Sequence, residues 1–223
     1  MSAAGPARPA AGWLEPEVER ELPGLRLIAG EVRVGRSGPL SGDSPPDIQA
    51  RLRELSSRVR GARAIGVRSE PVAGAYRIFF RHIGLDPDVE RTPLEAALAQ
   101  RMLHGGFLTG GLLEDILLIA LIDTGVAVWA LDTETIEGRL GIRTSREGER
   151  LGRAGGGPAP APGTLVVADS SAALAPLFGE SAPGHGAGPQ SRRLTLFALQ
   201  VPGVPALYVE EALWSSASAL EAG

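Results

Sequence analysis

The spacing of apolar and polar residues changes along this chain near Gly125. Ahead of Gly125, apolar residues recur every three or four positions, which is typical of helices that bury one face. Beyond it, short apolar runs alternate with glycine- and proline-rich turns, which is typical of β-strands. The expected helices span 46–62, 72–82, 92–104, 111–123 and 210–220, and the expected strands span 24–34, 126–132, 139–144, 165–169, 193–201 and 206–211.

The order of these elements predicts the fold class. Helices in the N-terminal half and strands in the remainder favour an α+β domain with a sheet or sandwich core flanked by helices. A length of 223 residues suits one well-buried domain, which we place over residues 24–223. Residues 1–23 are rich in alanine, proline and acidic residues, and we expect them to form a flexible arm that becomes ordered only if Trp13 docks.

Local signals mark the ends of several helices. Thr92-Pro93-Leu94-Glu95 has the pattern of a capping box with proline at the first helical position. Gly105 and Gly125 follow the last apolar positions of two helices, where a left-handed residue commonly ends a helix. At the C-terminus, we expect Leu213 and Trp214 to pack the last helix against the domain.

The composition excludes several kinds of chemistry. The chain has no cysteine, so it forms no disulfides, thiolate zinc sites or cysteine nucleophiles. Every basic residue is arginine, which excludes lysine Schiff bases and the P-loop lysine. No HExxH, GxSxG or GxGxxG motif with the required context occurs. We therefore expect no metal and no cofactor.

The hydropathy of the chain bears on its location. No apolar run reaches the roughly 20 residues that a membrane-spanning helix needs, and the N-terminal residues lack the apolar segment of a signal peptide. Together with the absence of cysteine, this favours a cytoplasmic protein without a membrane partner.

Charge is unevenly distributed, although the net charge is only −4. The segment 51–81 holds eight arginines against two glutamates, whereas 92–150 holds nine acidic residues against five arginines. Arginines in the first segment are candidates for contacts with RNA phosphates. The alternative is a solvated helix face with ion pairs to the acidic segment. The RNA-binding candidates are Arg51, Arg58, Arg77 and Arg81.

Two titratable residues lie in unusual sequence surroundings. Asp115 lies within the apolar run LLEDILLIAL, so its carboxylate needs hydrogen bonds, either from backbone donors or an arginine or within a site. His185 lies in the glycine-rich loop 179–190, where it could contact a ligand. His82 and His104 lie near helix C-termini, where a cation suits the helix dipole.

The stretch 76–149 combines two helices, a short strand, an acidic turn, a second strand and an Arg-Glu-Gly-Glu turn. In this order it resembles the editing module of the phenylalanyl-tRNA synthetase β subunit, the B-three/B-four tRNA-binding domain, which also occurs as small free-standing proteins. The resemblance extends over roughly residues 25–205. It implies that this chain has the fold of the editing module and that its partner is tRNA or aminoacyl-tRNA.

The resemblance also implies a pocket, but several of its polar groups are replaced. Asp115 matches the aspartate of the family's Val-Asp-x-x-Asn pattern, whereas Leu118 stands in place of the asparagine. Trp129 stands in place of the editing histidine and Leu108 in place of an arginine. Asp132 ends the strand, as in the family, and Phe178-Gly179-Glu180 resembles the family's Phe-Gly-Gly-Glu, whose glutamate recognises the amino acid. The resulting pocket candidates are Asp115, Trp129, Asp132, Glu180 and His185, with no catalytic residue assigned.

Two functions from different classes are compatible with these features. In the first, the protein is an aminoacyl-tRNA deacylase that hydrolyses misacylated tRNA in trans, using a positioned water and backbone donors for the oxyanion. In the second, it is a non-catalytic module that recognises tRNA or an amino-acid-like small molecule. We expect Trp129 to form an apolar wall that favours a hydrophobic ligand group.

Overall fold

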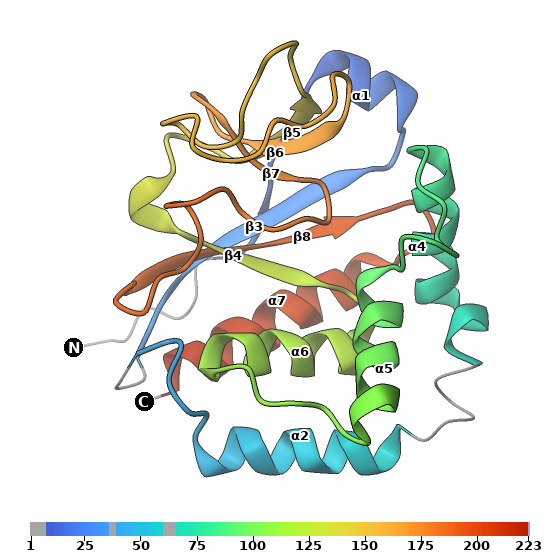
Figure 1. Ribbon diagram of the computed structural model, residues 1–223, viewed down its shortest axis with the longest axis vertical. Helices are drawn as coiled ribbons and strands as arrows, with labels where there is room; N and C mark the ends of the chain where they lie inside the picture. The colour runs from blue at the N-terminus through green and yellow to red at the C-terminus, as the bar shows by residue number, and fades with distance from the viewer. Residues whose placement is uncertain (1–7, 36–38, 60–65, 223) are drawn as a thin grey trace.

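The computed structural model describes residues 8–35, 39–59 and 66–222 and has an α+β architecture with two sheets (Figure 1). The first sheet has the strand order β1-β3-β8-β4, and all neighbouring strands are antiparallel. The second sheet has the order β2-β5-β6-β7 and is antiparallel except for the β2–β5 pair. The strands are β1 (Ala10–Ala11), β2 (Trp13–Leu14), β3 (Arg26–Arg33), β4 (Val128–Asp132), β5 (Gly141–Thr144), β6 (Leu165–Ala168), β7 (Ala173–Pro176) and β8 (Arg193–Gln200).

The two sheets and the helices form successive layers. In Figure 1 the second sheet lies above the first sheet, α6 and α7 lie below it, and α2 forms the lowest layer. α7 packs on β3 and β8 and also on α6, which in turn contacts α2. The helices are α1 (Pro16–Glu21), α2 (Pro46–Arg58), α4 (Pro71–His82), α5 (Pro93–His104), α6 (Leu112–Thr124) and α7 (Ala206–Glu221), with short 3-10 turns η1 (Val67–Ser69) and η2 (Thr133–Thr135).

Strand β8 is at the centre of the core. Residues 194–199 are all buried, because the second sheet covers one face of this strand and α7 the other. A strand covered on both faces needs an apolar run instead of an alternating pattern, and β8 has such a run, interrupted only by Thr195. Within the described residues, no helix combines the length and apolarity needed to cross a bilayer.

The predicted capping signals of α5 and α6 are confirmed. Thr92 and Glu95 form the capping box, in which the Thr92 backbone N–H donates to the Glu95 carboxylate at 3.3 Å. Gly105 and Gly125 end α5 and α6 in the left-handed conformation, with φ of 75° and 76°. The predicted helix 46–62 is present up to Arg58, and residues 60–62 lie outside the described part of the chain.

Residues 8–23, which we expected to form an arm that is flexible unless Trp13 docks, are ordered in the structure. β1 pairs with β3 in the first sheet and β2 pairs with β5 in the second, so this segment crosses between the layers at Gly12. The Gly12 backbone lies so close to the carbonyl of Leu140 that a side chain would collide there. Trp13 does dock, since its indole N–H donates to the carbonyl of Arg139 at 2.8 Å. Residues 1–7 lie outside the described part of the chain.

Near the C-terminus one strand prediction is wrong, one strand was not predicted, and the expected packing of Trp214 is also wrong. Residues 206–211, predicted as a strand, form the first turns of α7, which begins after Pro205. The short strand β7 was not predicted, because its four residues include a proline and offer little pattern. Trp214 does not pack α7 against the domain: it is 64% exposed, whereas Leu213 is buried.

Candidate functional site

A cleft of about 1020 Å³ opens beside β4, an edge strand of the first sheet. We call it the aromatic cleft. Its walls come from α5 and α6 on one side and from the ends of strands β5, β6 and β7 on the other, and α1 and α4 contribute at their ends. Its apolar lining includes Val18, Leu22, Phe80, Ile83, Pro93, Leu117, Leu118, Leu121, Val128, Trp129, Leu165, Pro176, Leu177 and Phe178.

Phe178 is the centre of an aromatic cluster at this cleft. Its ring centroid lies 4.8 Å from that of Phe80 and 5.9 Å from that of Trp129, and it meets Tyr76 and Phe79 edge-on at 6.1 and 6.0 Å. Trp129 also stacks on Phe197 of β8, with centroids 5.6 Å apart. Rings at these separations attract one another beyond the area that they bury. The cluster therefore holds the apolar wall of the cleft in a defined shape.

The backbone of Phe178 is unusual. Its φ is 63°, and no other non-glycine residue in the described ranges has a positive φ. A bulky side chain in this region of backbone space costs on the order of 1–3 kcal/mol, and such residues cluster at ligand sites. The surrounding rings hold Phe178 in this conformation, which presents its side chain to the cleft.

Polar and charged side chains border the apolar wall. Arg91 and His82 line the cleft together with Glu90 and Glu114. Within the described residues, none of these four side chains has a hydrogen bond or an ion pair. The cleft thus offers an apolar body and, beside it, both a free cation and free carboxylates. That combination suits a molecule with a hydrophobic group and a polar or zwitterionic end.

The structure brings together only some of the pocket candidates. Trp129 lines the cleft, and so does Leu118, which stands where the resembling family has an asparagine. Phe178 and Gly179 line it as well, whereas Glu180 is exposed and lies outside the lining. Leu108 is 60% exposed and also does not line the cleft.

Asp115 lies elsewhere and its hydrogen bonds are satisfied. It is 1% exposed near the start of α6, where the Ser44 hydroxyl donates to it at 2.6 Å and the backbone N–H of Gly110 donates at 3.0 Å. These bonds join the start of α6 to the segment before α2. Asp115 therefore stabilises the packing of two helices, and its neighbour Glu114 faces the cleft instead.

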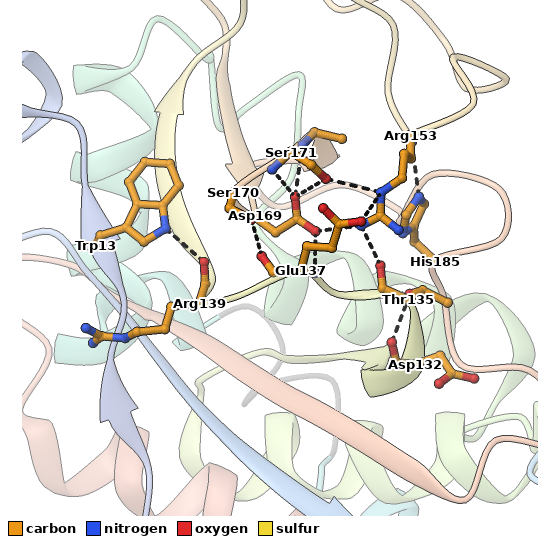
Figure 2. A network of polar contacts seen from close by, with 11 residues as sticks. Trp13, Asp132, Thr135, Glu137, Arg139, Arg153, Asp169, Ser170, Ser171 and His185 are labelled. Carbon is orange, nitrogen blue, oxygen red and sulfur yellow. Dashed lines mark hydrogen bonds and ion pairs between the residues drawn. The ribbon is translucent and has the colours of Figure 1, made fainter.

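Asp132 and His185 belong to a polar network separate from the cleft (Figure 2). Asp132 lies three residues after Trp129 on β4, and alternation along a strand places the two side chains on opposite faces. Asp132 accepts a hydrogen bond from the Ser191 hydroxyl and from the backbone N–H of Glu134, and its own N–H donates to the carbonyl of His185. These contacts fasten the loop 179–190 to the end of β4.

His185 is buried within this loop, at 5% exposed. Its Nε2 accepts a hydrogen bond from the backbone N–H of Arg153 at 3.2 Å, so the ring N–H is on Nδ1. Nδ1 has no hydrogen-bond partner in the described structure. The imidazole contributes to loop packing and does not reach the aromatic cleft.

Asp169 is the organising residue of the network, and the sequence reasoning missed it. Its carboxylate accepts hydrogen bonds from the backbone N–H groups of Glu137, Ser171 and Ala172 at 2.7 to 2.9 Å, and Arg153 pairs with it at 3.1 Å (Figure 2). Burial alone would raise the pKa of Asp169, but these hydrogen bonds lower it below its usual value. An aspartate directly after a buried strand and followed by two serines is the sequence signal that could have indicated this turn.

The RNA-binding candidates are engaged in ion pairs. Arg77 is 8% exposed and pairs with Glu95 at 2.6 Å and with Asp88 at 2.7 Å, so it is a buried structural residue. Arg51 pairs with Asp123 at 2.8 Å and with Glu54 at 2.7 Å. Arg58 and Arg81 are about half exposed and lie 3.7 and 3.8 Å from the carboxylates of Glu54 and Asp88. These four arginines therefore have ion pairs with acidic residues, as the alternative interpretation expects.

Within the described residues, no three histidine or acidic side chains are grouped in a way that could hold a metal ion. Comparison with protein-family models and with curated proteins gives no match to this chain.

Proposed function

We propose that this protein is a non-catalytic binding module that holds a small molecule of the amino-acid kind, with a hydrophobic side chain, in the aromatic cleft. The observation that carries the proposal is the cleft of about 1020 Å³ with an aromatic wall and, beside it, charges of both signs that have no partner among the described residues. The hydrophobic side chain fits against Trp129 and Phe178, Arg91 is suited to a carboxylate, and Glu114 is suited to an ammonium group.

The proposal includes the fold of the phenylalanyl-tRNA synthetase editing module, with its catalytic polar groups lost. Leu118 and Trp129 occupy the positions of two editing residues in that resemblance, and both side chains line the cleft. An apolar wall there favours burial of a hydrophobic group and offers nothing to position an attacking water. The pairing of Arg51, Arg58, Arg77 and Arg81 with acids argues for the small molecule over tRNA as the partner.

Calorimetric titration of the protein with single amino acids tests this function. We expect L-phenylalanine and L-leucine to bind with a negative heat-capacity change, and L-glutamate to bind much more weakly. Leu118→Glu places a carboxylate in the cleft and should abolish binding. Leu103→Glu is the matched control, because Leu103 is 76% exposed and lies outside the cleft.

A deacylation assay with misacylated tRNAs separates the two functions. The binding-module proposal predicts hydrolysis at the uncatalysed rate. Accelerated hydrolysis that Leu118→Glu removes would instead establish the trans-editing deacylase. Failure of every hydrophobic amino acid to bind would contradict the proposed ligand class.

A further inference from the structure

A groove of about 510 Å³ lies on the face of the first sheet against which α7 packs, between α7 and the strands β1 and β3. Its floor includes Ile28 and Leu196, and α7 provides one wall with Leu207, Leu213 and Trp214. It shares no lining residue with the aromatic cleft. α7 packs on β3 and β8 and leaves the part of the sheet toward β1 open.

Large apolar side chains project beside this groove. Trp214 is 64% exposed and Leu207 is 69% exposed. They are seven residues apart on α7, so they lie on the same side of the helix. The same surface therefore carries both a hollow and a bulky apolar projection. A small ligand would account for the hollow alone, whereas contact between two identical surfaces accounts for both.

Glu31 on the strand side pairs with Arg193, and the charges on the two walls that have no partner among the described residues are of opposite sign. Arg26 lies on the strand side of the groove, and Glu210 and Glu211 lie on the α7 side. All three side chains are exposed, and within the described residues none has a hydrogen bond or ion pair. When two copies meet across a two-fold axis that runs along the groove, the strand side of each copy meets the α7 side of the other. Arg26 of each copy then lies opposite Glu211 of the other copy.

We propose that this groove is the interface of a two-fold symmetric dimer, with a second copy of this chain as its occupant. Trp214 of each copy inserts into the groove of the other, and Arg26 pairs with Glu211 across the axis. Tryptophan and arginine are enriched at the centres of protein–protein interfaces, and this surface has an exposed tryptophan beside the groove and an arginine at its border.

Sedimentation equilibrium of the full chain, from about 1 µM to about 1 mM, tests the dimer. We expect a reversible monomer–dimer equilibrium, and Trp214→Ala should raise the dissociation constant at least about tenfold. Leu103→Ala is the control, because Leu103 is also an exposed apolar residue, lies on α5 and does not line the groove. Circular dichroism of each variant checks that these exposed substitutions leave the fold intact.

Charge-reversal variants provide the decisive experiment. Arg26→Glu and Glu211→Arg should each weaken self-association, because like charges then face one another across the axis. An equimolar mixture of these two variants should form heterodimers, since both cross-axis pairs are again of opposite sign. A wild-type protein that stays monomeric at every concentration would overturn the proposal, and so would two variants that do not complement each other. Binding of amino acids in the aromatic cleft is unaffected in either case, so the two proposals fail separately.

Discussion

The buried ion pair between Arg77 and Glu95 allows a quantitative test of the helical half of the fold. Glu95 is 5% exposed and accepts hydrogen bonds from Arg77 at 2.6 Å and from the Thr92 hydroxyl at 2.9 Å, while Arg68 pairs with it at 3.0 Å. One carboxylate therefore links α4 to α5 and also completes the capping box of α5. Hydrogen bonds to Asp88 and Glu95 raise the pKa of Arg77 against the opposing effect of burial, so its guanidinium is charged.

Glu95→Ala removes both contributions at once. Loss of the hydrogen bond from the Thr92 backbone N–H to the Glu95 carboxylate costs about 1 kcal/mol. Removing one partner of a buried ion pair costs about 3–5 kcal/mol, and we expect the lower end because Asp88 still pairs with Arg77 at 2.7 Å. The free energy of unfolding should therefore fall by about 4 kcal/mol. For a domain of this size, that corresponds to a decrease in Tm of roughly 10 °C.

Urea and thermal unfolding followed by circular dichroism measure this loss. Glu54→Ala is the control, because Glu54 pairs with Arg51 and Arg58 on the surface and should contribute no more than about 1 kcal/mol. The double variant Arg77→Met/Glu95→Ala should be less destabilised than the sum of its single variants, since no uncompensated charge stays buried. A loss below about 1 kcal/mol in Glu95→Ala, or strictly additive variants, would refute this reasoning.

Three further predictions concern pH, the ligand and RNA. Because the pKa of Asp169 is lower in the folded protein than its usual 3.8, its contribution to stability is complete above about pH 5 and is lost as the pH falls through the lowered value. Asp169→Asn should thus be less stable than the wild type at neutral pH, with a difference that shrinks in acid unfolding; a constant difference would contradict this. Arg91→Gln should weaken binding of L-phenylalanine about tenfold or more in calorimetric titration while leaving phenylethylamine, which has no carboxylate, unchanged; equal losses for both would remove Arg91 from carboxylate recognition. Filter binding at low salt should detect little tRNA affinity; salt-dependent binding that is lost in the combined Arg51→Ala, Arg58→Ala and Arg81→Ala variant would restore the RNA-binding hypothesis.

The sequence by itself determined those features that depend on neighbouring residues. The capping box of Thr92 and Glu95 and the glycines that end α5 and α6 involve hydrogen bonds within one or two helical turns, so their spacing was sufficient. The α+β class was also predictable, because apolar periodicity distinguishes amphipathic helices from strands over long segments. The apolar character of Trp129 and Leu118 was visible before their position in the cleft was known.

Only the tertiary structure decided the features that depend on contacts between distant segments. Residues 206–211 are too short a run for periodicity to separate strand from helix, and packing on the first sheet makes them helical. Pairing of β1 and β2 with two different sheets ordered a segment whose composition indicated a flexible arm. The sequence does not distinguish Arg77 from a surface arginine, because its burial depends on a contact with Glu95, 18 residues away in the chain. Asp132 and Trp129 are close in sequence, yet the alternation of β4 assigns one to a structural network and the other to the cleft, because successive side chains of a strand point to opposite faces.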